Sequence, residues 1–338
     1  MNPAIFDKPS AAGALLGVGD IATPTAGYSL RYLSINYIGQ PVVRVRKDVV
    51  GNPEQDFTPN QLTDGTLASF ADGNDCFVSK WYDQFGSNDA TNSTAAEQPK
   101  IWDASTGLVT ENGKPAVEFD GVDDYIVTSN NFIANTDLSL FILHKFNSLT
   151  SKPQDIVSQG ASSNSQGFKY GMSGVGSNQL VIYLTSGNVI YTDDSSTIFQ
   201  ELHSLINTSS TATLNINSIN ESLSLSGSAG SIGNNNDPLT IGKRDSSNIY
   251  YVGKIQELII YTSDQSANRT KIEDNINLYY VLYGLKHYRQ RVLADSGTFA
   301  LQGRDALVYN SVTIPEMPSL ICSCDAYKAT KLYNINPA

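Results

Sequence analysis

The stretch from Tyr251 to Gly284, YVGKIQELIIYTSDQSANRTKIEDNINLYYVLYG, decides the fold class of this chain. Its first part, Lys254 to Tyr261, has the length of a β-strand, and three apolar residues in succession, Leu258 to Ile260, are typical of a strand buried on both faces. After a short polar turn, apolar side chains recur at helical spacing, at Ile272, Ile276, Tyr279, Tyr280 and Tyr283. Gly284 is the expected end of this helix, because glycine readily adopts the left-handed conformation of a helix terminus. The stretch therefore predicts one long buried strand followed by one amphipathic helix.

Short apolar segments separated by turn residues precede this stretch, beginning after Gly113. The expected strands are Ala116 to Phe119, Tyr125 to Val127, Leu138 to Phe146, Asp155 to Ser158, Phe168 to Met172, Gln179 to Leu184, Asn188 to Tyr191, His203 to Thr208, Thr211 to Ile216, Leu239 to Ile241 and Lys254 to Tyr261. Many short strands with evenly spaced turns predict an antiparallel sandwich. Nearer the N-terminus we expect short helices at Ser29 to Ile38 and at Thr58 to Phe70, the second with Thr58 as its cap and proline in its first position.

Several of these segments resemble known families. The opening stretch and GKPAVEFDGVDDYIV (Gly113 to Val127) resemble the closing and opening elements of concanavalin A-like jelly rolls of the laminin-G type. Segments Tyr28 to Phe57, Asp64 to Phe70 and Phe77 to Asn92, the last containing WYDQFG, resemble the front half of the catalytic domain of arabinofuranosidase B enzymes and phage and marine-bacterial proteins that carry this module. The resemblance implies a mainly β fold, an antiparallel jelly-roll sandwich (concanavalin A-like, laminin-G-like) with short helices and N- and C-terminal extensions.

The expected organisation has three parts. Residues 1–27 are rich in Ala, Gly and Pro and are interpreted as an N-terminal arm. Residues 28–284 form the laminin-G-like sandwich, including a front module at 28–112. Residues 285–338 change character, lie outside the resemblance and are interpreted as a C-terminal attachment segment.

Composition restricts the function classes. The 338 residues carry a net charge of −11, with 33 acidic and 22 basic side chains, so no basic surface for nucleic-acid phosphates is expected. Cys76, Cys322 and Cys324 form no disulfide framework or zinc pattern by spacing. The N-terminus lacks a basic segment followed by an apolar core, so we expect no signal peptide and no membrane insertion. An outward-facing fold without an export signal favours a virion protein made in the host cytoplasm.

The resemblance also bears on catalysis. A retaining glycosidase needs two carboxylates about 5 Å apart. By resemblance, Asp245 in IGKRDSSN takes the acid/base position, whereas the stretch expected to carry the nucleophile, Gln166 to Gly174, contains no carboxylate. The expectation is therefore that the chain is not an enzyme and has no catalytic residue, with Asp245 a candidate only under the alternative that it is a glycoside hydrolase.

Other polar and aromatic residues are candidates for binding. Tyr82, Asp83 and Trp102 are the candidate glycan-binding residues, while Trp81, on the alternate face of the same strand, is expected in the core. Asp120, Asp123 and Asp124 are hard oxygen ligands at short spacing and are the candidate Ca²⁺ ligands, against the alternative of a solvated turn. No other cofactor is expected.

The leading hypothesis is a phage virion structural and adhesion protein: a capsid decoration, head-fibre or tail-fibre component with a lectin-like domain for host or environmental glycans. Expected partners are other virion proteins, further copies of the chain, with a trimer as the expected assembly, and glycans. The alternative is a glycoside hydrolase or carbohydrate-binding module acting on arabinose-containing polysaccharide. A bacterial surface adhesin is a third possibility, weakened by the missing signal peptide.

Overall fold

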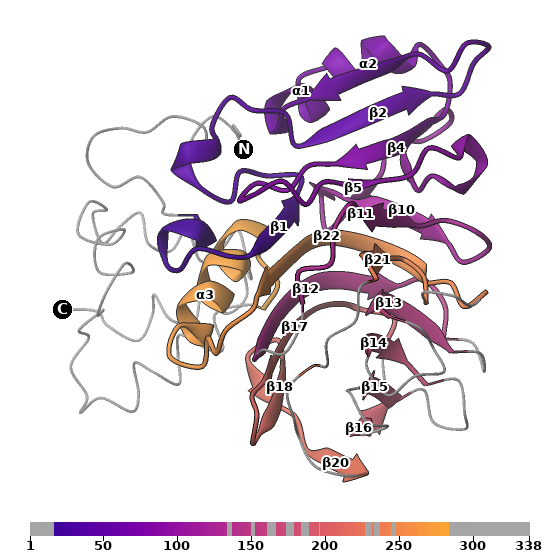
Figure 1. Ribbon diagram of the computed structural model, residues 1–338. Coiled ribbons are helices and arrows are strands. Elements are labelled where there is room, and N and C mark those ends of the chain that lie inside the picture. Colours follow the sequence, from indigo (N-terminus) through magenta and orange to yellow (C-terminus); the bar gives the residue numbers. More distant parts are fainter. Residues whose placement is uncertain are drawn as a thin grey trace, which may run out of the picture. The chain divides into compact units, whose positions relative to one another are not determined.

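Antiparallel β-strands make up most of the described chain in the computed structural model (Figure 1). The structure describes residues 17–133, 137–149, 153–160, 167–173, 179–183, 189–195, 197–226, 232, 237–244 and 248–283. Leu16–Leu282 forms one compact unit, and residues 1–15 with 283–338 form another that lies, except for Tyr283, outside the described residues. The attachment segment expected at 285–338 and most of the arm therefore lie outside them as well.

The strands are β1 (Ala26–Ser29), β2 (Val43–Lys47), β3 (Glu54–Phe57), β4 (Cys76–Trp81), β5 (Ala90–Thr91), β6 (Lys100–Asp103), β7 (Gly107–Leu108), β8 (Thr110–Glu111), β9 (Lys114–Pro115), β10 (Val117–Asp120), β11 (Ile126–Thr128), β12 (Leu138–Phe146), β13 (Gln154–Gln159), β14 (Phe168–Met172), β15 (Gln179–Tyr183), β16 (Val189–Ser195), β17 (Gln200–Asn207), β18 (Ala212–Ile216), β19 (Ile219–Asn220), β20 (Leu223–Ser226), β21 (Leu239–Ile241) and β22 (Val252–Tyr261). The α-helices are α1 (Pro59–Thr63), α2 (Thr66–Ala71) and α3 (Arg269–Tyr280), and the 3₁₀ helices are η2 (Val18–Asp20), η3 (Ile35–Tyr37) and η4 (Ala95–Glu97). Within the described residues, none of these helices has the length and apolar character needed to span a bilayer.

The strands form two layers. In the first layer the order is β18, β17, β12 and β22, and the far edge of β22 pairs with β1 and with β10. The second layer runs β3, β2, β4, β5, β11, β21, β13, β14, β15, β16 and β20, and most of these strands can be followed from top to bottom in Figure 1. Strand β6 joins the layers, because it pairs with both β4 and β10. The architecture is a β-sandwich, which confirms the predicted mainly β fold class.

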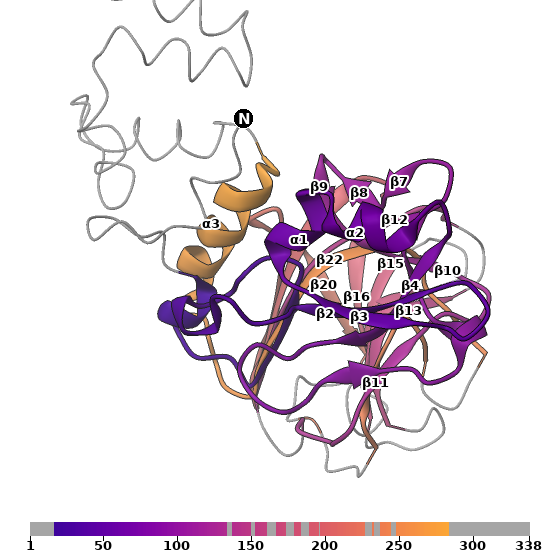
Figure 2. The same ribbon diagram turned by 90° about the horizontal axis from the view of Figure 1, so that it is seen from above.

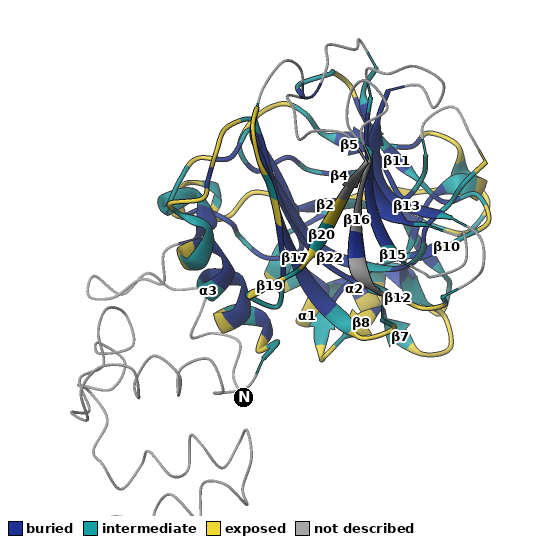
Figure 3. Ribbon diagram, turned by 90° about the horizontal axis from the view of Figure 1, so that it is seen from below, coloured by how far each residue is buried: buried dark blue, intermediate teal, exposed yellow. Residues whose placement is uncertain are grey.

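The main core lies between the layers. Strands β12 and β22 contribute Leu140, Ile142, Leu258 and Ile260 to a single cluster with β14 and other second-layer strands, and the strands are largely buried in Figure 3. The alternate residues of these strands, such as Phe141 and Ile259, are buried outside that cluster, on the side where α3 packs (Figure 2). The predicted burial of Leu258 to Ile260 on both faces is therefore confirmed: one face meets the core and the other meets the helix.

The predicted helix at Ser29 to Ile38 is wrong. Ser29 closes β1 and only Ile35–Tyr37 turns as η3. The reason is a buried side chain: Gln84 donates to the carbonyl oxygens of Ser29 and Arg31 at 3.2 and 2.7 Å and accepts from the Leu33 amide at 2.8 Å. These bonds hold backbone groups that a helix would use internally. The predicted arm boundary between residues 27 and 28 falls inside β1.

Two other helices differ from the sequence expectation, one in where it ends and one in its continuity. Helix α3 ends at Val281, which adopts the left-handed conformation at φ 55°, rather than at Gly284. The Asn277 side chain stabilises that end by accepting from the Leu282 amide at 2.9 Å. The helix expected from Thr58 begins with Pro59 as predicted, and Gln61 accepts from the Thr58 amide, but Gly65 at φ 98° divides it into α1 and α2.

Candidate functional site

A row of paired residues crosses the outer face of the second layer. From β15 to β3 the register aligns Tyr183, Lys169, Ser158, Thr240, Val127, Thr91, Lys80, Arg44 and Asp56, each opposite the next. Directly paired residues in antiparallel strands point to the same face. Their chain neighbours, such as Tyr170 and Trp81, are fully buried in the core cluster, so this set, here called the outer row, faces away from the core.

A buried ion pair lies beside this row. The Arg244 guanidinium donates from Nε to Asp155 Oδ2 at 2.7 Å and from Nη2 to Oδ1 at 2.9 Å, and the Asp155 side chain is only 1% exposed. Asp155 pairs with Gly171 of β14, two residues from Lys169 of the outer row. The Lys169 ammonium and the Arg244 guanidinium both lie against the Tyr183 ring, at 5.4 and 5.9 Å from its centre. We call Asp155, Lys169, Tyr183 and Arg244 the Asp155 site.

The electrostatics of the Asp155 site are those of a desolvated carboxylate held by cations. Burial raises the pKa of the Asp155 carboxyl, and the hydrogen bonds and charge of Arg244 together with the charge of Lys169 oppose that shift. Both carboxylate oxygens accept from the planar guanidinium, which is the bidentate geometry of an ionised pair. The site therefore contains one buried, oriented carboxylate with two cations and one phenol near it.

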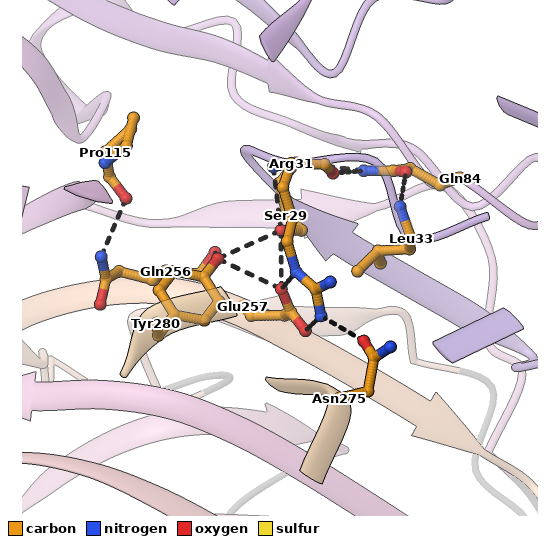
Figure 4. A network of polar contacts seen from close by, with 9 residues as sticks. All are labelled: Ser29, Arg31, Leu33, Gln84, Pro115, Gln256, Glu257, Asn275 and Tyr280. Carbon is orange, nitrogen blue, oxygen red and sulfur yellow. Dashed lines mark hydrogen bonds and ion pairs between the residues drawn. The ribbon is translucent and has the colours of Figure 1, made fainter. Parts of the chain in front are cut away.

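A second buried ion pair, Arg31 with Glu257, lies on the other side of the first layer and has a structural role (Figure 4). Arg31 donates to both oxygens of Glu257 at 2.7 and 2.8 Å and to the Asn275 side chain at 3.0 Å. Ser29 donates to Glu257 at 2.9 Å, and the Tyr280 hydroxyl lies 3.2 Å from the same carboxylate. These partners come from β1, the segment after β1, β22 and α3, so the pair holds these parts of the chain together rather than facing a site.

The predicted glycan-binding residues are placed separately. Tyr82 follows Lys80 on the outer side of β4, and its hydroxyl donates to Asp56 at 2.8 Å. Asp83 is buried and accepts from the amides of Gly27, Phe85 and Asn88 at 3.0, 3.1 and 3.2 Å. Trp102 pairs with Cys76, at the other end of β4 from Tyr82, and is half-buried against the core. At about 3.3 Å per residue, β4 separates Tyr82 and Trp102 by roughly 20 Å, so the three residues form no common site. The predicted core position of Trp81 is confirmed.

The predicted metal ligands do lie together. Carboxylate oxygens of Asp120, Asp123 and Asp124 lie within 4.8 Å of one another. Asp120 already accepts from the Val122 amide at 2.7 Å, and Asp124 accepts from the Asp120 amide at 2.9 Å, so the same groups also form a hydrogen-bonded turn. Burial raises the pKa of Asp124 to about 7, with smaller contributions from the charges of Asp120 and Asp123. Oxygen ligands at this spacing fit Ca²⁺, and the cluster stays a candidate for it.

Asp245, the candidate acid/base under the hydrolase alternative, lies outside the described residues. Sequence reasoning missed Asp155, because it searched for a partner carboxylate only in Gln166 to Gly174. Pairing of β13 with β14 places Asp155 opposite Gly171 in that stretch. The available signal was an acidic residue at the start of an expected strand, a position where a charge is costly unless it is paired.

Solved structures with this fold include three structures of arabinofuranosidases. A variant of a GH54 α-L-arabinofuranosidase soaked with 4-nitrophenyl α-L-arabinofuranoside is 12% identical, with a TM-score of 0.60, over 77% of this chain and 65% of that chain. A GH54 α-L-arabinofuranosidase soaked with a cyclic sulfate inhibitor is 12% identical, with a TM-score of 0.57, over 77% and 65%. An arabinofuranosidase complexed with arabinofuranosyl-α-1,2-xylobiose is 13% identical, with a TM-score of 0.56, over 77% and 64%. The chain thus spans less than two thirds of the length of these enzymes.

No protein-family model matches the chain, and no curated protein matches it. At 12–13% identity the structural likeness shows the fold, and it agrees with the resemblance to arabinofuranosidases seen in the sequence. The phage-type part of that resemblance has no support among these structures.

These structures correct two expectations. The hypothesis of a phage virion structural protein is contradicted, because three solved structures that share the fold over 77% of the chain are of glycoside hydrolases. The expectation that the chain is not an enzyme is contradicted by the same finding. The alternative stated from the sequence, a glycoside hydrolase or carbohydrate-binding module acting on arabinose-containing polysaccharide, fits these structures better than the virion hypothesis does.

Proposed function

We propose that this chain is a glycoside hydrolase domain that cleaves arabinofuranosyl groups from arabinose-containing polysaccharide, with Asp155 as the nucleophilic carboxylate. The observation that carries the proposal is the Asp155–Arg244 pair on the outer face of the second layer. The fold it shares with arabinofuranosidases supports the same conclusion. The proposal takes the sandwich to be of the concanavalin A-like jelly-roll type, which the long closing strand β22 and helix α3 support.

The chemistry follows from the charge and position of Asp155. In a double displacement, a carboxylate oxygen attacks the anomeric carbon while the bond to the leaving oxygen breaks, and an acid protonates that oxygen. Water then cleaves the glycosyl ester, which returns Asp155 as a carboxylate and releases arabinose. Arg244 favours the ionised form of Asp155 and fixes its orientation through two hydrogen bonds. Asp245, the next residue after Arg244 in the sequence, is the acid/base that the resemblance supplies.

Aryl arabinofuranoside hydrolysis tests the proposal. The unmodified chain should release nitrophenol, and Asp155→Asn should lower kcat by about a thousandfold or more, the scale for loss of a nucleophile. Azide should restore turnover to Asp155→Gly, with an arabinosyl azide as product, because a small anion can occupy the place of the missing carboxylate. A merely structural Asp155 would give no azide rescue.

A matched variant separates catalysis from folding. Arg44 and Asp56 form a bidentate pair at 2.7 and 3.0 Å on the same face, with side chains 39% and 38% exposed. Asp56→Asn should keep aryl-glycoside turnover within about twofold, the range expected for a change outside the reacting centre. The proposal fails if the unmodified chain has no turnover, or if Asp155→Asn retains the activity of Asp56→Asn.

A further inference from the structure

The outer face carries a hollow that the proposed catalytic site does not use. Its volume is about 350 Å³, at the lower end of the range for ligand sites, and its lining includes Arg44, Glu54, Lys80, Thr91, Ser93 and Tyr125. Three of these residues, Arg44, Lys80 and Thr91, belong to the outer row. We call this concavity the Tyr125 hollow.

Both cations that line the Tyr125 hollow are compensated. Arg44 lies 2.7 Å from Asp56, and Lys80 lies 3.1 Å from Asp89, so both cations have carboxylate partners. Within the described residues, the hydroxyl groups of Thr91 and Ser93 make no hydrogen bond with the protein. Hydroxyl groups both donate and accept, which suits a ligand that is itself rich in hydroxyls and carries no charge.

Tyr125 gives the hollow an oriented aromatic wall. Its ring is half-buried, and the Lys243 ammonium lies 4.4 Å from the ring centre. The same ammonium lies 5.2 Å from the ring of Tyr250, which does not line the hollow. An aromatic surface beside free hydroxyl groups combines apolar contact with polar orientation, the usual composition of a small-ligand site.

The hollow and the Asp155 site lie on the same sheet, two strands apart. Tyr125 immediately precedes β11, Asp155 lies in β13, and β21 pairs with both strands. Two strand spacings of about 4.8 Å separate β11 from β13, so the two sites lie on the order of 10 Å apart across the sheet. Lys243, which contacts Tyr125, is the residue before Arg244, which holds Asp155.

We propose that the Tyr125 hollow is a second sugar-binding site, which holds the main chain of a neutral polysaccharide whose arabinosyl branch enters the Asp155 site. The assignment of the branch rests on the proposed function, whereas binding of the main chain rests on the hollow alone. The two sites together make the domain specific for branched polymer over free arabinosides. Thr91 and Ser93 bond the main-chain hydroxyls, and Tyr125 contacts a ring face.

Paired tyrosine variants test this proposal. Tyr125→Ala should weaken binding to a neutral arabinoxylan, measured by affinity electrophoresis and calorimetry, by roughly tenfold, the equivalent of about 1.4 kcal/mol. Its kcat/KM on an aryl arabinofuranoside should stay within about twofold, because that substrate has no main chain. Tyr250→Ala removes the other ring that Lys243 contacts and should change neither quantity. Ser93→Trp, at an exposed position, should block polymer binding without unfolding the protein.

The outcomes separate this inference from the proposed function. If the unmodified chain does not hydrolyse the aryl substrate but binds arabinoxylan through Tyr125, the hydrolase proposal fails and main-chain binding in the Tyr125 hollow is supported. If the unmodified chain hydrolyses the aryl substrate but Tyr125→Ala and Ser93→Trp bind polymer as it does, sugar binding in the Tyr125 hollow is refuted and the hydrolase proposal is supported. The proposal would also be overturned if Tyr125→Ala and Tyr250→Ala lost affinity for arabinoxylan equally, or if the unmodified chain bound polygalacturonate more tightly than arabinoxylan.

Discussion

Replacing Arg31 by methionine should be among the most destabilising single changes in the sandwich. Arg31 makes three charge-assisted hydrogen bonds, two to Glu257 and one to Asn275, and its side chain is only 9% exposed. Methionine leaves the Glu257 carboxylate, 1% exposed, with only the Ser29 and Tyr280 hydroxyls as partners. Removing one member of a buried pair costs about 3–5 kcal/mol, because the remaining charge is desolvated and uncompensated.

The matched control is Arg44→Met. Arg44 has the same bidentate geometry toward Asp56, yet both side chains are more than a third exposed. Water can hydrate Asp56 when its partner is lost, so the expected cost is about 0–1 kcal/mol. The difference between the two variants therefore isolates burial, since the hydrogen-bond geometry is shared.

Urea unfolding followed by the fluorescence of Trp81 and Trp102 measures both costs. The double variant Arg31→Met/Glu257→Leu should be more stable than Arg31→Met alone, because it removes the buried unpaired charge together with its partner. Equal losses in the free energy of unfolding for Arg31→Met and Arg44→Met would refute this reasoning. A double variant less stable than Arg31→Met would refute it as well.

Three further predictions concern pH, metal and chain length. The folded-state pKa of Asp124, about 7, lies above the unfolded value of 3.8, so its stabilising contribution is complete below about pH 4 and is lost as pH rises through 7. The free energy of unfolding of the unmodified chain, measured by urea titration, should therefore fall by up to about 4 kcal/mol relative to that of Asp124→Asn between pH 4 and pH 8. A difference between the two free energies that does not change with pH would contradict this. Millimolar Ca²⁺ should raise the melting temperature of the unmodified chain but not of Asp123→Asn, and equal shifts would place any ion outside the Asp120–Asp124 turn. A fragment of residues 16–282 should keep the circular dichroism and the melting temperature of the full chain. A fragment of residues 28–284 should melt at a lower temperature, because it lacks half of β1 and the buried Val18. Equal melting temperatures for the two fragments would show that residues 16–27 add no stability.

Local patterns in the sequence predicted much of the fold because they depend on neighbours in the chain. The apolar run at Leu258 to Ile260 predicted a doubly buried strand, and the spacing of Ile272, Ile276 and Tyr280 predicted the face of α3 that packs on it. Thr58 and Pro59 predicted the start of α1. Periodicity and capping are properties of a few consecutive residues, so they can be read without knowing the tertiary structure.

Only the tertiary structure decided where the chemistry lies. Asp155 and Arg244 are 89 residues apart, and they meet because β13 pairs with both β14 and β21. That pairing includes a register shift between Asp155 and Val157, and one residue of shift decides which face a side chain occupies. Gln84 likewise prevents a helix after Ser29 through bonds to residues more than 50 positions away. Register and long-range hydrogen bonds depend on which strands become neighbours, and no short window of sequence contains that information.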